Sequence, residues 1–232
     1  LIQSPDDVLL VLDYHRHFTH ALTFAPIGAL IAALLLWPLL RKTLSFPRIY
    51  LYSLAGYSVA GLLDACTSYG THLWLPFSER KEAWNLIAVF DPLFTLLLLV
   101  PLALALRRPQ RRWAPVGLTL AAAYLGLGML QHQRAETALR DVVAARDHPA
   151  PNAVIKPTMA NQVLWRTLYV HEGRLQSDAF HLGWKVRHYP GESAPLMDQA
   201  AVARVVGDHP RRREDLDRFR RFSDGFLIAD TA

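Results

Sequence analysis

Cysteine is nearly absent from this 232-residue sequence, in which Cys66 is the single example. One thiol cannot form an internal disulfide, so a disulfide-stapled fold is excluded and the redox compartment stays undecided. The sequence also lacks a Gly-rich phosphate loop, a G-x-S-x-G turn, a Cys pair and an internal repeat. Any chemistry must therefore come from other residues.

Charge is scarce in the first half and concentrated in the second. The chain has 25 Lys and Arg against 20 Asp and Glu, a formal charge of +5. A basic balance can indicate nucleic-acid binding. Here, however, the arginines divide between short loops and a tail in which 211–213 run into acidic residues, without a basic stripe interleaved with aromatics. We therefore predict a membrane portion followed by a water-soluble portion, and no nucleic-acid partner.

Four apolar stretches predict transmembrane helices over residues 21–40, 49–66, 84–106 and 113–130. About 20 residues at about 1.5 Å each span a hydrocarbon core of about 30 Å. The fold class is thus mainly α, a polytopic helical bundle over residues 1–130. Because the chain begins at Leu1, in what reads as the middle of a sequence, we also expect an upstream segment.

Positive charge predicts the orientation of this bundle. Lys and Arg cluster in the loops after the first and third spans, and the positive-inside rule places these loops in the cytoplasm. The histidine-rich stretch before the first span, the Asp64 to Arg80 region, Asp91 and everything after Leu130 then lie on the outer side.

Residues 131–152 predict a connecting helix and linker, and residues 153–232 a small extracytoplasmic α+β domain. The change from helical periodicity to period-two alternation places this boundary. The expected elements are a helix over 131–147, strands over 163–169 and 175–182 joined by a turn at 171–174, and helices over 194–205 and 215–222. Its histidines have no ligand-like spacing and are interpreted as surface residues: His171, His181, His188 and His209.

The stretch 13–20 is the densest polar segment, with three histidines, Arg16 and Asp13 directly ahead of the first apolar run. Imidazole is the commonest neutral metal ligand near neutral pH. On a helix His15 and His20 would lie about 140° apart, whereas His17 and His20 would share a face, so spacing does not select the ligands. The alternative is a set of interfacial residues, with Arg16 meeting lipid headgroups and the histidines in water.

The second and third spans each hold a single carboxylate, Asp64 and Asp91. An ionisable residue inside a membrane is costly and normally faces the bundle interior with a partner, so both are predicted site residues. For Asp64 the alternative is a carboxylate that already lies at the interface. Pro92 restricts Asp91 to extended or turn conformations and predicts that the third span opens locally.

Four separated motifs occur together between residues 15 and 96. They are His15-Arg16-x-x-Thr19-His20, Leu62-Leu63-Asp64-Ala65-Cys66-Thr67-Ser68-Tyr69-Gly70-Thr71, Pro76-Phe77-Ser78-x-Arg80 and Asp91-Pro92-Leu93-Phe94-Thr95-Leu96. In this order they resemble the bacterial inner-membrane family of metal-dependent hydrolases called the YdjM-like group. The later stretches 156–158, 165–169 and 222–225 look like the C-terminal domain of one branch of that family.

The resemblance implies a multi-pass inner-membrane protein that holds a divalent metal, zinc, through His15, His20, Asp64 and Asp91. Two departures stand out. Relatives usually carry an Asp-containing motif upstream of the first histidine, which this sequence does not reproduce. They also often have a histidine about four residues before the aspartate of the second motif, where this chain has Ala60. His72 is the expected substitute ligand.

Two imidazoles and two carboxylates can hold zinc and leave a position for water, whose pKa the metal lowers to about 7. Arg16 or Arg80 would then clamp an anionic group of the substrate through a planar guanidinium. We expect a membrane-bound metal-dependent hydrolase that acts on an amphiphilic, lipid-like ester or phosphoester at the outer interface.

The rival interpretation is a non-catalytic membrane protein. Its His/Asp cluster binds a structural metal or only packs helices, while its outer domain recognises a partner. A third possibility is ion transport, but the paired broken helices or inverted repeats usual at midplane transport sites are missing from the sequence.

Overall fold

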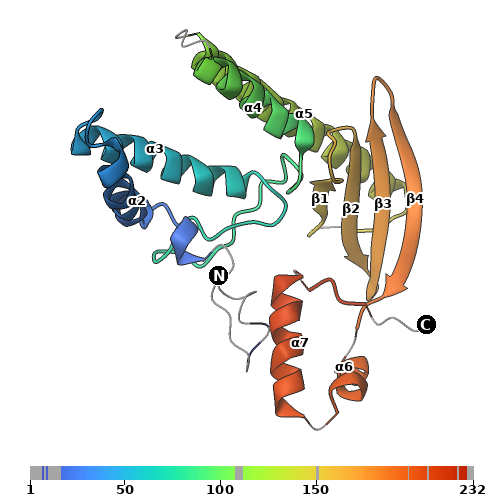
Figure 1. Ribbon diagram of the computed structural model, residues 1–232. Coiled ribbons are helices and arrows are strands. Elements are labelled where there is room, and N and C mark those ends of the chain that lie inside the picture. The colour runs from blue at the N-terminus through green and yellow to red at the C-terminus, as the bar shows by residue number, and fades with distance from the viewer. Residues whose placement is uncertain are drawn as a thin grey trace. The chain divides into compact units, whose positions relative to one another are not determined.

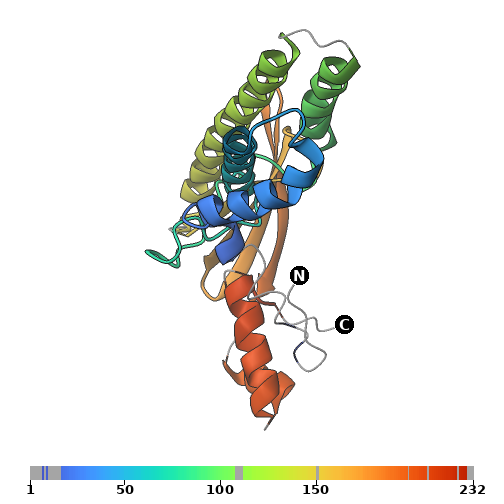
Figure 2. The ribbon, with the colours of Figure 1, turned by 60° about the vertical axis from the view of Figure 1, so that its left-hand side comes forward.

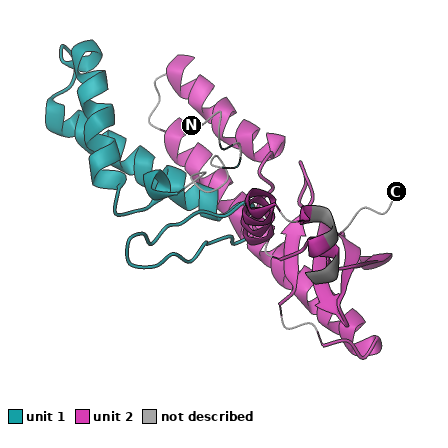
Figure 3. Cartoon of the chain, turned by 90° about the horizontal axis from the view of Figure 1, so that it is seen from below, with its two compact units in different colours: residues 1–84 teal, residues 85–232 magenta. Residues whose placement is uncertain are grey.

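The computed structural model describes residues 7, 9, 17–107, 112–149, 152–197, 199–207, 209–223 and 225–228. Helices fill the first part of the chain, and an antiparallel sheet followed by two helices fills the second (Figure 1). The chain divides into two compact units, Leu1–Trp84 and Asn85–Ala232, which Figure 3 colours separately. The prediction of a mainly helical protein with a small α+β region at its C-terminal end is confirmed.

The first unit contains a short 3-10 helix, η1 (Phe18–His20), and two α-helices, α2 (Ala25–Leu40) and α3 (Phe46–Ala65). Each α-helix begins with a proline in its first turn, where the missing N–H has no helical partner to lose. The helices pack closely because Gly28 of α2 has no side chain: a Cβ there would lie 2.4 Å from the ring of Tyr57 on α3.

In the second unit, α4 (Pro92–Arg107) and α5 (Trp113–Ala145) pack side by side, as Figure 2 shows. The predicted start of the third span at Trp84 is wrong, because residues 84–91 are not helical. Instead, α4 begins at Pro92, and the Asp91 carboxylate accepts a hydrogen bond of 3.0 Å from the backbone N–H of Phe94. An aspartate before a proline at the first helical position is a strong helix start.

Membrane crossing is supported unequally by these helices. Of the helices in the described residues, only α5 is both long and apolar enough to cross a membrane, judged by length and composition. The apolar helices α2 and α4 have 16 residues each, whereas a helix needs about 20 residues to span a bilayer core. The four predicted helices are therefore present, while four membrane crossings remain a prediction.

The sheet consists of β1 (Val154–Pro157), β2 (Leu164–His171), β3 (Arg174–Leu182) and β4 (Val186–Pro195), antiparallel and in sequence order. The predicted hairpin is confirmed. Its loop residues Glu172 and Gly173 both have positive φ, 48° and 69°, as a type I′ turn requires. The helices α6 (Gln199–Val206) and α7 (Pro210–Phe222) follow. The expected helix start at Ala194 is wrong, because that residue pairs with Leu175 in the sheet.

The hydrophobic core of the second unit lies between the sheet and the C-terminal half of α5. Ala135 and Leu139 of α5 pack in one cluster with Trp165, Tyr169 and Phe180 of the sheet. The predicted span 113–130 and connecting helix 131–147 are therefore one continuous helix of 33 residues. The predicted domain boundary at 130 falls inside it.

Candidate functional site

His20 and Asp64, two of the predicted metal ligands, meet in the first unit. His20 Nε2 lies 3.2 Å from Asp64 Oδ2, and the two side chains are 36% and 23% exposed. The other ring nitrogen of His20, Nδ1, lies 3.0 Å from the hydroxyl of Thr19. The pair is thus partly shielded, within reach of solvent, and has its imidazole fixed from both sides.

One face of α3 brings this pair together. Tyr57, Gly61 and Asp64 follow one another at the i, i+4, i+7 spacing of a helix face. The Tyr57 hydroxyl donates a hydrogen bond of 2.7 Å to the carbonyl of Thr19. A Cβ on Gly61 would lie 2.7 Å from the carbonyl oxygen of His20. Direct contact between η1 and α3 therefore depends on the glycine. Sequence reasoning missed Tyr57, although its spacing from Asp64 was available.

His72 lies in the loop after α3 and has a different neighbour, His17. Their ring centroids are 5.3 Å apart, and His72 Nδ1 lies 2.9 Å from the carbonyl oxygen of Glu79. Burial lowers the pKa of His72 below its ordinary value, with the nearby charge of His17 adding to the effect, against the opposing hydrogen bond of Glu79. The imidazole is therefore neutral at physiological pH, the form in which histidine ligates metals.

The other predicted residues of the N-terminal region have different outcomes. Arg80 is exposed, and its Nε lies 3.4 Å from Glu82 Oε1. His15 and Arg16 lie outside the described residues. Across the residues that the structure describes, no three His, Cys, Asp or Glu side chains form a group that could hold a metal ion. His72 is thus not grouped with His20 and Asp64.

Asp91, the last predicted ligand, belongs to the second unit and is 5% exposed. One carboxylate oxygen caps α4, as described above, and the other accepts a hydrogen bond of 2.8 Å from the hydroxyl of Tyr124 on α5. Tyr124 is itself buried and packs its ring 5.9 Å from that of Phe94. The sequence indicated a partner for Asp91, but nothing in it identified Tyr124.

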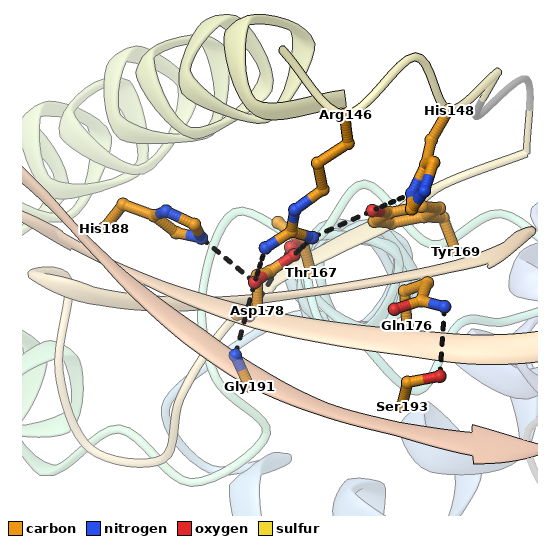
Figure 4. A network of polar contacts seen from close by, with 9 residues as sticks. All are labelled: Arg146, His148, Thr167, Tyr169, Gln176, Asp178, His188, Gly191 and Ser193. Carbon is orange, nitrogen blue, oxygen red and sulfur yellow. Dashed lines mark hydrogen bonds and ion pairs between the residues drawn. The ribbon is translucent and has the colours of Figure 1, made fainter. Parts of the chain in front are cut away.

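A second polar network, which the sequence did not predict, joins the end of α5 to the sheet domain, the region formed by β1 to β4 and the helices α6 and α7 (Figure 4). The Asp178 side chain, 1% exposed, accepts two hydrogen bonds from Arg146, of 2.7 and 3.0 Å. His188 Nε2 lies 2.9 Å from the same carboxylate, and the backbone N–H of Gly191 lies 3.3 Å from it. Burial alone would raise the pKa of Asp178, but these partners outweigh it and hold that pKa below its ordinary value.

The histidines of the sheet domain are only partly the surface residues that we predicted. His188 belongs to the Asp178 network, and His171 stacks on His148 with ring centroids 3.8 Å apart. The His148 Nδ1 lies 3.2 Å from the hydroxyl of Tyr169, which also accepts a hydrogen bond of 2.9 Å from Arg146. His209 is exposed, as expected. This network ties the end of α5 to the sheet.

Comparison with known families identifies the family to which the first part of the chain is similar. Residues 4–135 match the model of the family described as YdjM inner membrane protein, a match that covers more than half of the chain. The chain belongs to the YdjM family. Neither the curated proteins nor the solved structures give a match. The YdjM match includes His20, Asp64 and Asp91 and ends inside α5, so the sheet domain lies beyond it.

Proposed function

We propose that this YdjM family member is a membrane-bound hydrolase that uses a divalent metal, zinc, to cleave an amphiphilic ester or phosphoester at the outer face of the inner membrane. The observation that carries the proposal is the meeting of His20 and Asp64, from different elements, at 3.2 Å. Both stand in the motifs that resemble the YdjM-like group, and both are of ligand type.

The spacing of this pair supports zinc as the metal of the proposal. Two donors on one tetrahedral zinc, each about 2.1 Å from the ion, lie about 3.4 Å apart, close to the 3.2 Å between His20 Nε2 and Asp64 Oδ2. Metal-binding imidazoles usually have their second nitrogen hydrogen-bonded, as the Thr19 hydroxyl provides here. The remaining ligands of the proposal are His15 and Asp91, with His72 as the substitute.

A divalent metal, when bound, supplies Lewis-acid activation of water near neutral pH. The residues of the chain then have separate tasks. Thr19 holds the ring of His20, and Arg16 or Arg80 pairs with the anionic group of the substrate. The Arg80 side chain is 78% exposed. Because exposed ion pairs contribute little, Arg80 can exchange Glu82 for a ligand anion at small cost.

An apolar groove beside His20 supports an amphiphilic substrate. Its volume is about 410 Å³, and Phe18 and Ala21, which stand on either side of His20 in the sequence, line it together with Phe24 and Ile27 of the α2 region. Ligand pockets of about 300–1,000 Å³ with mostly apolar walls are typical of small-molecule sites. A hydrocarbon chain there would leave the polar end of its molecule near the His20–Asp64 pair.

Four membrane crossings, by α2 to α5, are part of the proposal. Exposed apolar side chains cover α2 and α4, among them Ile31, Leu35, Leu99 and Leu102, and an exposed apolar surface of this kind requires lipid or a partner. Local thinning of the bilayer accommodates helices that are a few residues short. The loops after α2 and α4 would face the cytoplasm.

A second candidate function is a non-catalytic membrane protein in which His20 and Asp64 form only a packing ion pair. The observation that favours it is the two hydrogen bonds of Asp91, which give that carboxylate a role in helix capping without a metal. In this case neither zinc nor hydrolysis would be found, and loss of His20 would reduce stability alone.

The experiment is metal analysis and phosphoester hydrolysis by the full chain purified in detergent. We expect bound zinc, turnover of a chromogenic phosphoester that a chelator removes and zinc restores, and loss of both in His20→Ala and Asp64→Asn. The matched controls His209→Ala and Asp141→Asn change exposed residues of the same types and should retain both. Full activity in the first pair of variants would refute the proposal.

A further inference from the structure

The segment 85–91, which leads to Asp91, has no helix or strand of its own, yet it is firmly held. Leu86 and Ile87 are 8% and 4% exposed, and Asp91 is 5% exposed. A Cβ on Gly128 of α5 would lie 2.2 Å from the carbonyl oxygen of Leu86. At Leu86 the segment therefore lies directly on the backbone of α5, and its buried carbonyls need partners other than water, while Val89 and Phe90 are exposed.

Two of those partners come from the loop between β1 and β2, residues 158–163. The side-chain amide of Gln162 donates a hydrogen bond of 2.8 Å to the carbonyl of Leu86. The backbone N–H of Ala160 donates one of 3.0 Å to the carbonyl of Phe90. Gln162 is only 5% exposed. The loop therefore contacts the segment 85–91 at two points. One is Leu86, near the start of the segment, and the other is Phe90, next to Asp91.

The loop is itself fixed by buried groups. The Gln131 side-chain amide donates to the carbonyls of Gln162 and Leu182, at 3.0 and 2.9 Å. Arg134 donates to the side-chain oxygen of Gln131 at 2.7 Å. The Asn161 side-chain oxygen accepts hydrogen bonds from the backbone N–H groups of Val163 and Leu164, where β2 begins. Gln162 therefore stands on a rigid base shared by α5 and the sheet.

We propose that the sheet domain, which lies outside the matched YdjM region, serves to hold Asp91 in place, and that Gln162 is its positioning residue. The hydrogen bonds from residues 160 and 162 fix the segment 85–91, and that segment fixes where α4 begins and where the Asp91 carboxylate lies. Gln162 does not touch the reacting groups. Only the expected effect of Gln162 on catalysis rests on the proposed function.

The test compares Gln162→Met with Gln176→Met in the full chain in detergent. Methionine matches glutamine in length and is unbranched, but it cannot donate a hydrogen bond. Gln176 lies on β3, and its side-chain amide donates a hydrogen bond of 3.0 Å to the hydroxyl of the exposed Ser193 on β4 (Figure 4). Gln176→Met therefore removes a hydrogen bond within the sheet and none of the described bonds to residues 85–91. Hydrogen exchange of the amides in 85–95 is the measurement, because it includes Phe94, whose N–H the Asp91 carboxylate accepts.

We expect exchange in 85–95 to become about ten- to a hundredfold faster in Gln162→Met, because a buried carbonyl loses its donor. The amides of β2 and β3 should keep their protection, and Gln176→Met should leave 85–95 unchanged. Unchanged exchange in Gln162→Met, or equal acceleration in both variants, would overturn the proposal.

If exchange in β2 and β3 also becomes faster in Gln162→Met, Gln162→Asn is used for the same comparison. Asparagine keeps the side-chain amide but is one methylene shorter, so the amide no longer reaches the Leu86 carbonyl. Acceleration confined to 85–95 in that variant supports the proposal, and acceleration only together with the sheet overturns it. In an active enzyme, Gln162→Met should lower kcat with KM little changed. A wild-type chain without hydrolysis would refute the proposed function and leave the exchange result standing.

Discussion

Replacing Arg146 by methionine should destabilise the sheet domain more than replacing its partner Asp178 by asparagine. The Asp178 side chain is 1% exposed and that of Arg146 is 28% exposed. Without Arg146, a carboxylate remains sealed away from water. Without the charge of Asp178, the guanidinium can turn toward solvent.

The magnitudes follow from that asymmetry. Removing one partner of a buried pair costs about 3–5 kcal/mol when the other charge is stranded. In Arg146→Met the cost is lower, because His188 and the backbone of Gly191 still bond to Asp178. We expect a loss of about 2–4 kcal/mol for Arg146→Met and about 1–2 kcal/mol for Asp178→Asn. Arg140→Met, which breaks only the exposed pair with Glu136 on the same helix, should cost less than about 0.5 kcal/mol.

The assay is hydrogen exchange of the protected β2 and β3 amides at pH 7 in the detergent-solubilised chain, corrected for intrinsic rates. A loss of about 2–4 kcal/mol corresponds to exchange that is roughly 30- to 900-fold faster. The reasoning from burial would be refuted if Arg146→Met exchanged no faster than Arg140→Met, or if Asp178→Asn proved the more harmful change.

Three further predictions concern acid and close backbone contacts. The pKa of Asp178 is lowered in the folded state. Its stabilising contribution is therefore complete above about pH 4 and is lost as the pH falls through the folded pKa. Acid unfolding followed by circular dichroism should show that Asp178→Asn loses less stability below pH 4 than the wild type does. Gly61→Ala would place a Cβ 2.7 Å from the His20 carbonyl oxygen and should lower the free energy of unfolding by about 1–3 kcal/mol, measured by thermal unfolding. The control is Gly56→Ala, in which nothing lies within 4 Å of the new Cβ. It should be neutral or stabilising by up to about 1 kcal/mol. Gly191→Ala would place a Cβ 1.9 Å from the Ser177 carbonyl oxygen and should separate β4 from β3, which exchange of the β4 amides would reveal.

The sequence predicted those elements whose signal is local. The hairpin of β2 and β3 has period-two alternation and a turn that glycine makes possible, and both were found where expected. β4 was missed because its residues are mostly exposed on both faces and include Pro190 and Gly191, so no alternation marks it. The apolar character of residues 84–91 predicts a helix there, although Pro92 permits a helix to begin at that point as readily as to bend.

The candidate site was predictable to the extent that its residues are charged or imidazole-bearing. His20 and Asp64 were singled out from the sequence, and they meet. Tyr57, Tyr124 and Gln162 were not, because a neutral side chain that bonds to a backbone carbonyl or a carboxylate leaves no periodic or compositional mark. Their partners become visible only when distant segments are brought together by folding.

The unbroken course of α5 has a consequence for how this protein can be rebuilt. Its only proline, Pro115, stands near its start, and its last turns pack on the sheet. Each residue inserted or deleted between those ends rotates one end about 100° against the other, which would turn Tyr124 away from Asp91 or Leu139 away from Trp165. Grafting the sheet domain onto a different membrane helix should therefore require a junction that preserves both phase and length. An insertion of about seven residues restores the phase, but it moves one end about 10 Å along the axis and would separate Gln162 from Leu86.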